Sequence, residues 1–158
     1  MYLRKTKILF FALFTILLTN ACNNSYYRKE ELIQNNLWQI ENIKEFEFSI
    51  DDKNSKYDIY IEIENNNQYN TSNLWLYLDS ELPDAKLQKD TVMFLLSDDN
   101  GKPYGEISGD NVTSRFLYKK DFTFPQTGKY KFRIKHGMRE KDLPALNKIC
   151  LEIEKAVH

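Results

Sequence analysis

Few side chains in this sequence are suited to covalent or acid–base chemistry. The chain contains two cysteines, Cys22 and Cys150, and two histidines, His136 and His158. Neither histidine stands at a spacing typical of a nucleophile and its base, a metal-ligand set or a phosphate-binding loop. The acidic residues are numerous but scattered, so they define no general acid–base pair. The sequence therefore predicts a protein that has no catalytic residues and uses no cofactor or metal.

The connection 97–114 is the one segment whose composition suggests calcium. It carries three glycines and four acidic residues within 18 positions. An EF-hand loop with Gly101 at its invariant glycine would place Leu96 and Ile107 at the first and twelfth ligand positions, which require oxygen ligands. That site is excluded, and irregular calcium binding stays an alternative. A connection of this length is commonly functional or mobile.

Cys22 stands where a thiol can receive lipid. Three basic residues lie within the first seven positions, an apolar run follows at 8–18, and the small Ala21 precedes the cysteine. This order is typical of a secretory signal, and the run is about half of the roughly 20 residues that a spanning helix needs. The Ala-Cys end resembles the lipobox of bacterial lipoproteins. We expect residues 1–21 to be a cleaved signal peptide and Cys22 to carry acyl chains, with an uncleaved anchor as the alternative.

Charge and thiol content narrow the function further. Removal of the signal leaves 19 basic side chains against 23 acidic ones, so bulk attraction to nucleic acid is not indicated. Only Cys150 would then be a free thiol, and no intrachain disulfide can form. We expect Cys150 to be a small packed side chain, and a reactive or intermolecular thiol is the alternative.

The pattern after residue 36 is that of strands. Apolar residues alternate with polar ones at 46–50, 57–64, 74–78, 129–136 and 149–153, and 91–96 is a more continuously apolar run. Turn residues such as Asn100-Gly101 and the segment 125–128 separate these runs. The sequence predicts one all-β domain, an antiparallel β-sandwich of about seven or eight strands, at 37–158. Residues 22–36 are polar and without sustained period, and we expect them to be a tether.

Exposed aromatic residues are the first candidates for partner binding. Trp75 and Tyr77 lie on the outward face of the predicted strand 74–78. If 57–64 is its hairpin neighbour, Tyr60 shares that face, and the three rings would form a platform for sugars or a partner protein. The alternative is that loops or the tether cover the rings. Arg139 is the fourth contact candidate.

A row of cations lies on one face of the predicted strand 129–136. Lys129, Lys131, Arg133 and Lys135 could meet phosphate or an acidic partner. Acidic side chains also point outward on the strands 57–64 and 149–154, so we expect cross-strand ion pairs there instead.

Several blocks together resemble the gliding-motility lipoprotein GldH family of Bacteroidetes. The most specific is Gly137-Met138-Arg139-Glu140 with Leu143 and Pro144 after it. The other blocks are Cys22 after the signal, 57–61 running into 65–69, 72–76, 90–92, 99–102, Phe124-Pro125 with 128–130, and 151–155. Together they cover almost the whole chain after the signal. The segment after Gly101 departs from the family because it lacks an aromatic-rich stretch.

The resemblance implies a noncatalytic envelope lipoprotein that is an accessory or scaffold of the gliding machinery, which overlaps the type IX secretion system. Its partners would be the membrane, through the lipid anchor, and proteins of that apparatus. The expected location is the outer membrane, facing the periplasm. A carbohydrate-binding lipoprotein that uses Tyr60, Trp75 and Tyr77 is the alternative. Saturable glycan binding lost in Trp75→Ala would favour that alternative over the scaffold.

Overall fold

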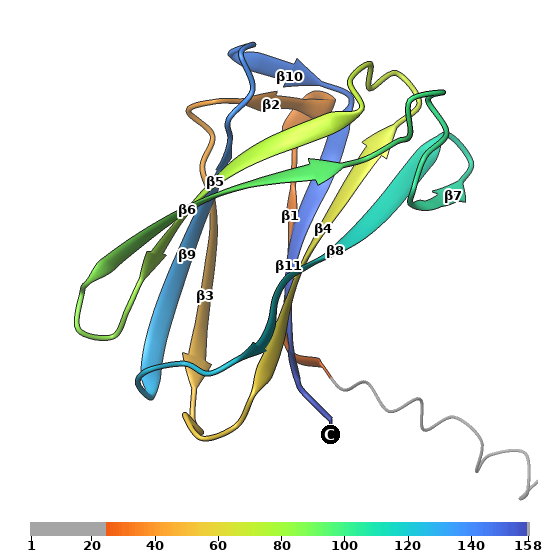
Figure 1. Cartoon of the computed structure of the whole chain (residues 1–158). Coiled ribbons are helices and arrows are strands. Elements are labelled where there is room, and N and C mark those ends of the chain that lie inside the picture. Colours follow the sequence, from red (N-terminus) through yellow and green to blue (C-terminus); the bar gives the residue numbers. More distant parts are fainter. Residues whose placement is uncertain (1–24, 158) are drawn as a thin grey trace, which may run out of the picture.

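Two antiparallel sheets form the body of the protein in the computed structural model, which describes residues 25–157 (Figure 1). The five-stranded sheet has the order β1 (Ser25–Leu32), β11 (Leu146–Lys155), β4 (Tyr57–Asn66), β8 (Asn111–Phe122) and β7 (Glu106–Ser108). The four-stranded sheet has the order β3 (Lys44–Ile50), β9 (Gly128–His136), β5 (Asn73–Glu81) and β6 (Leu87–Leu95). The short strands β2 (Leu37–Gln39) and β10 (Asp142–Pro144) pair with each other, and a 3-10 turn, η2 (Gln34–Asn36), precedes β2.

Alternating side chains explain how the two sheets pack. Along β3 every second residue is buried, and β9 shows the same alternation from Tyr130 to His136. The buried side chains meet between the sheets in one cluster with a large aromatic share, in which Phe48 and Phe124 contact each other and Tyr130. The all-β antiparallel sandwich is thus confirmed. Within the described range it has eleven strands rather than seven or eight, because the eleven include three short strands of three residues each, β2, β7 and β10.

The expected tether is wrong for most of its length. Residues 25–32 form β1, which pairs with β11 from Ser25 opposite Glu154 to Leu32 opposite Lys148. The segment escaped recognition because an edge strand that carries Arg28, Lys29, Glu30 and Glu31 reads as a polar run. Charged side chains are a common device for protecting a sheet edge from other chains. The folded domain therefore begins at Ser25 and includes most of the segment that the sequence predicts to be a tether.

The expected hairpin between 57–64 and 74–78 is also wrong. β4 and β5 follow each other in sequence but lie in different sheets, and β4 pairs with β11 and β8. β5 instead forms its hairpin with β6 through residues 82–86. A period of two reveals which side chains share a face of a strand, but it does not reveal the neighbouring strand.

The two sides of the sandwich differ in the side-chain contacts that close their edges. On one side, side chains bind the backbone of the opposite edge strand: Lys29 Nζ donates to the Glu45 carbonyl at 2.9 Å and Lys44 Nζ to the Leu32 carbonyl at 2.7 Å. On the other side, β6 and β8 meet through side chains, with the rings of Phe94 and Phe116 stacked at 4.3 Å. Asp90 of β6 also accepts hydrogen bonds from Tyr118 and Lys119 of β8.

Candidate partner-binding face

An apolar patch lies on the outer face of β5 and β6. Trp75, Tyr77, Met93 and Leu95 are 43%, 42%, 40% and 47% exposed, and we call these four side chains the aromatic face. Trp75 is directly opposite Met93 in the β5–β6 ladder, so the two side chains are neighbours. Clustered exposed apolar side chains are more informative than single ones, because they commonly mark a contact surface.

The segment after β9 supports the aromatic face from beside it. Gly137 donates its backbone N–H to the Trp75 carbonyl at 2.7 Å, and the Trp75 N–H points to the Met138 sulfur at 3.4 Å. A Cβ atom on Gly137 would lie only 2.8 Å from the Tyr77 ring. The ring therefore packs directly over the glycine backbone. This contact gives a structural role to the Gly137-Met138 pair that the sequence singled out.

Charged pairs neutralise the neighbouring part of the same face. Lys131 binds Glu47 at 2.6 Å, and Arg133 binds both Glu45 at 3.1 Å and Glu81 at 2.8 Å. Lys135 lies 5.7 Å from the centre of the Tyr77 ring. Cross-strand ion pairing is confirmed for Lys131 and Arg133, whereas no ion pair within residues 25–157 involves Lys129 or Lys135. The expected partners on 57–64 and 149–154 are wrong, since those strands belong to the other sheet.

Tyr60 does not join Trp75 and Tyr77. It lies on the outer face of the five-stranded sheet, where the Arg115 guanidinium stacks over its ring at 3.4 Å. The predicted platform of three rings is therefore wrong, and two aromatic side chains remain on the aromatic face. Arg139 follows Met138 directly, is exposed, and forms no ion pair or hydrogen bond with any residue of 25–157.

Residues 25–153 match the protein family described as "GldH lipoprotein". The chain belongs to this family. It is 31% identical over 162 residues to the "Gliding motility lipoprotein GldH homolog" of Christiangramia forsetii, covering 98% of this chain and 99% of the relative. It is 27% identical over 128 residues to the "Gliding motility lipoprotein GldH" of Flavobacterium johnsoniae, covering 81% of this chain and 79% of the relative.

Two solved structures show remote likenesses to this GldH family member. One is the VP2 subviral particle of infectious bursal disease virus, with 11% identity and a TM-score of 0.33 over 82% of this chain and 34% of that one. Another is dimeric latent PorU from Porphyromonas gingivalis, with 11% identity and a TM-score of 0.34 over 83% of this chain and 13% of that one. The resemblance to the GldH family predicted from the sequence is confirmed, and with it a lipoprotein of the cell envelope linked to gliding motility.

A second cluster in this family member lies on the outer face of the five-stranded sheet. The Arg28 guanidinium binds both oxygens of Glu62 at 2.8 Å and reaches Glu152 at 3.1 Å. Arg115 binds Glu152 at 3.0 Å and Glu154 at 2.8 Å. Glu62 and Glu152 are buried, and the bidentate contact with Arg28 is the main reason why the pKa of Glu62 lies below its ordinary value. The cluster joins β1, β11, β4 and β8.

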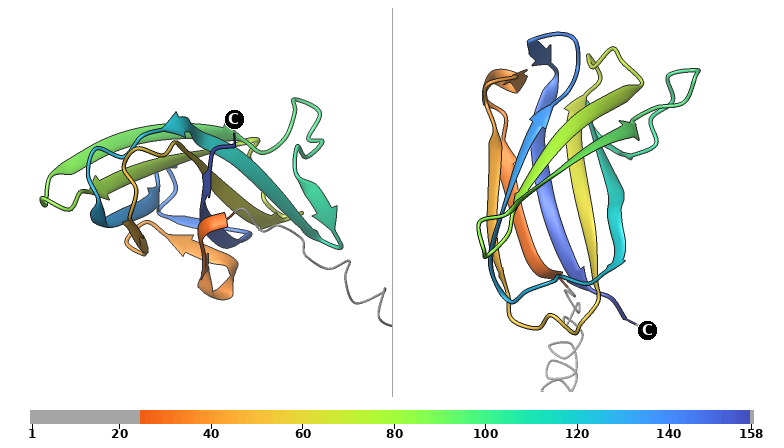
Figure 2. Two further views of the ribbon diagram at one scale, coloured as in Figure 1. Left: turned by 90° about the horizontal axis from the view of Figure 1, so that it is seen from below. Right: turned by 60° about the vertical axis from the view of Figure 1, so that its left-hand side comes forward.

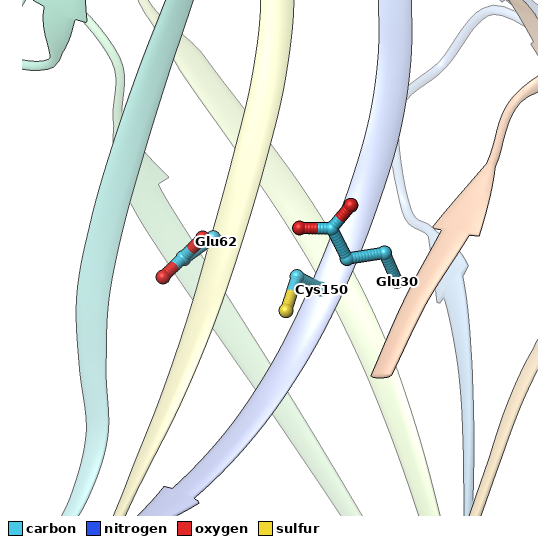
Figure 3. Close-up of side chains that lie close together, drawn as sticks. All are labelled: Glu30, Glu62 and Cys150. Atoms are coloured by element: carbon cyan, nitrogen blue, oxygen red, sulfur yellow. The ribbon is translucent and has the colours of Figure 1, made fainter. Parts of the chain in front are cut away.

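Cys150 lies beneath this cluster, between Glu30 and Glu62 (Figure 3). One ligand atom from each of the three side chains lies within 4.8 Å of the others, as a metal site would require. The contacts of Arg28 argue against a metal. Its guanidinium binds the carboxylates of both Glu30 and Glu62, so a cation would have to displace a charged group that already neutralises them. We therefore propose no metal there.

Two of the cavities lined by residues 25–157 lack the features of a small-molecule site. A pocket of about 130 Å³ opens between β6 and β8 and is lined mainly by aromatic and apolar side chains around Phe122, Phe124 and Phe132. Ligand pockets are commonly some 300 Å³ or larger. A hollow of about 580 Å³ lies between the segments 65–72 and 96–112, and its lining mixes asparagine, hydroxyl and aspartate side chains with apolar ones such as Leu96 and Ile107. The 97–114 connection forms one wall of this hollow.

Sequence reasoning missed Met93 and Leu95. The run 91–96 is apolar at nearly every position, so its periodicity could not reveal which side chains face outward. It also missed the pairing of Arg28 with Glu62 and Glu152, which lie 34 and 124 positions away. Cys22 lies outside the described residues. Within 25–157 no helix is long and apolar enough to cross a membrane.

Proposed function

We propose that this protein is a noncatalytic, lipid-anchored accessory or scaffold of the envelope machinery for gliding or type IX secretion, and that it holds a partner protein on the aromatic face. The anchor would be acyl chains on Cys22, in the periplasmic leaflet of the outer membrane. Family membership supports the link to gliding, and the relatives are named lipoproteins rather than enzymes.

The observation that carries the docking proposal is the exposed cluster itself. Two aromatic side chains, a methionine and a leucine lie together outside the core, while Lys131 and Arg133 of the same sheet are held in ion pairs. Aromatic residues, methionine and arginine are the types enriched at protein interfaces. The unpaired Arg139 adds a charged group at the margin, where it can meet an acidic side chain of the partner.

The carbohydrate-binding alternative loses part of its support. It depended on three aromatic rings on one face, and Tyr60 lies on the other sheet beneath Arg115. Met93 and Leu95 take the remaining area beside Trp75 and Tyr77. Aliphatic side chains suit a protein surface better than a sugar, which offers hydroxyl groups as well as an apolar ring face.

The test is a crosslinked pull-down of the native lipoprotein from membranes, with recovered proteins identified by mass spectrometry. Trp75→Ala combined with Tyr77→Ala should reduce partner recovery at least tenfold, because aromatic anchors commonly contribute about 2 kcal/mol or more to an interface. The fold should survive, since both side chains are nearly half exposed. Arg139→Ala should reduce recovery less.

The matched control is Tyr104→Ala, which removes an exposed aromatic side chain outside the aromatic face. Its partner recovery should equal that of the unaltered protein. Cys22→Ala should abolish recovery from membranes by releasing the protein. Equal recovery with and without Trp75 and Tyr77 would contradict docking on this face, and a gene deletion without effect on motility or secretion would contradict the scaffold role.

A further inference from the structure

The start of β1 sets how far the folded domain can lie from Cys22. Ser25 is already paired with Glu154 of β11, so the ordered sheet begins three positions after the cysteine. A fully extended chain spans at most about 3.6 Å per residue, so the Cα atoms of Cys22 and Ser25 are within about 11 Å of each other. The ten residues of β4 alone span roughly 33 Å. The linker from Cys22 to Ser25 is therefore at most about a third of the length of β4.

The strands run along the length of the sandwich, so the domain has two distinct ends (Figure 2). At the near end lie Ser25 and the turns 51–56, 82–86 and 123–127, together with the residues after β11. At the far end lie the connecting segments 33–43, 67–72, 96–110 and 137–145. The hollow and the strands β2, β7 and β10 belong to the far end.

The charges of the two ends differ. The near-end turns carry three acidic and three basic residues, and Lys155 at the end of β11 adds another cation. The far-end segments carry seven acidic residues against three basic ones. An anionic bilayer surface repels the far end and attracts cations within about a Debye length of it. The charges of the two ends and the short linker from Cys22 to Ser25 thus both favour the near end as the one that faces the bilayer.

We propose that the near end faces the bilayer that holds the anchor, with the strands upright and the turns 51–56, 82–86 and 123–127 at the lipid headgroups. This rests on the proposed lipidation of Cys22. The far end then stands roughly 30 Å above the headgroups, from the strand lengths. Trp75 is six positions from the near end of β5, so the aromatic face lies roughly 20 Å above the bilayer. A partner must therefore reach the aromatic face either from the surrounding aqueous compartment or as a membrane protein whose domain extends to the same height above the bilayer.

The experiment measures the height of three labelled positions above the membrane. Asn54→Cys at the near end, Thr91→Cys midway along β6 and Asp99→Cys at the far end are all exposed sites, and the native Cys150 is fully buried. The full-length lipidated protein, purified from membranes, is labelled with a fluorophore at each site. It is then reconstituted into vesicles that contain lipids with a quencher on the headgroup. Quenching should be strong at Asn54, weaker at Thr91 and almost absent at Asp99.

A flexible insertion between Asn24 and Ser25 tests whether the short linker from Cys22 to Ser25 causes this order of quenching. Fifteen Gly and Ser residues add an average reach of roughly 20 Å, so quenching at Asn54 should fall severalfold. Equal quenching at the three sites, strongest quenching at Thr91 or Asp99, or unchanged quenching at Asn54 after the insertion would each overturn the proposal. Failure of the anchor itself is distinguishable, because the intact mass would then lack acyl chains and the protein would not float with the vesicles.

Discussion

At the scale of single residues, buried charges are satisfied by partners from distant parts of the chain. Glu62 and Glu152 are both buried, and each binds Arg28 and Arg115. Removing one partner of a buried pair is strongly destabilising, whereas an exposed pair such as Lys86 with Asp84 contributes little. The cluster therefore makes the position of β1 on the sheet depend on Arg28.

His136 is a buried residue whose charge opposes folding. The ring is completely buried against Trp38, with ring centres 5.6 Å apart. Burial lowers the pKa of His136 below 6.5, and Asp142 and Glu41, together with the nearby backbone of Lys141 and Trp38, oppose this only in part. The folded state thus keeps the ring neutral at a pH where the unfolded chain binds a proton.

We therefore predict that stability falls as the pH drops below about 6.5, the ordinary pKa of histidine. The unfolded state binds a proton that the folded state does not, so the slope is at most about 1.4 kcal/mol per pH unit for this one group. His136→Phe cannot bind the proton and should flatten the slope between pH 6.5 and 5.5. Urea denaturation of the Cys22→Ala protein at several pH values measures it.

The slope, rather than the absolute stability, is the readout for His136. His136→Phe changes packing against Trp38, so its stability at pH 8 serves as its own reference. A variant that keeps the full pH dependence of the unaltered protein would show that other groups cause it.

At the scale of elements, β1 is part of the folded domain and not a spacer. Its residues pair with β11 over the length of the strand. Arg28 forms an ion pair with Glu62 of β4, and Lys29 donates a hydrogen bond to the Glu45 carbonyl of β3. Tyr26 adds a hydrogen bond to the Ser49 carbonyl of β3 at 2.9 Å. These contacts connect the first strand to both sheets.

We predict that a soluble protein that begins at Ser25 folds, whereas one that begins at Ile33 is severely destabilised. The shorter protein exposes the β11 edge and leaves Glu62 and Glu152 without Arg28, which alone costs on the order of 3 kcal/mol. Thermal unfolding followed by circular dichroism measures the difference.

Arg28→Ala in the longer protein separates the charge effect from the loss of the strand, and its midpoint should lie between the other two. Equal unfolding temperatures for the proteins that begin at Ser25 and at Ile33 would restore the tether interpretation of residues 25–32.

At the scale of the whole molecule, Cys150 reports on the integrity of the sandwich. It lies in β11, between β1 and β4, and is completely buried beneath charged side chains. Burial raises the pKa of its thiol to about 12, so the reactive thiolate is scarce at pH 8.

We predict that a thiol reagent labels Cys150 only when the domain opens. In the Cys22→Ala protein, labelling at pH 8 should be slow without denaturant and should accelerate with urea in parallel with global unfolding. Asn54→Cys should be labelled at once, because that site is exposed. Rapid labelling of Cys150 in the native protein would mean that β1 separates readily from β11.

The sequence by itself determined the properties that depend on local order along the chain. The alternation at 46–50 and 129–136 predicted strands and their buried faces, because successive side chains of a strand point to opposite sides. The order of several blocks also predicted the GldH family, which the family match confirms. The cysteine at position 22 and the signal-like sequence before it are also features of adjacent residues, and the lipidation of Cys22 that they predict remains a proposal.

Only the tertiary structure decided which strands are neighbours. It separated Tyr60 from Trp75, brought Met93 and Leu95 beside Trp75, and assigned residues 25–32 to the edge of a sheet. Pairing between strands distant in sequence depends on the packing of the whole core, and a single strand's periodicity does not contain that information. A charged edge strand resembles a linker in sequence because the contacts that stabilise it are distant along the chain. For β1 they are the hydrogen bonds to β11 and the ion pair of Arg28 with Glu152 of that strand.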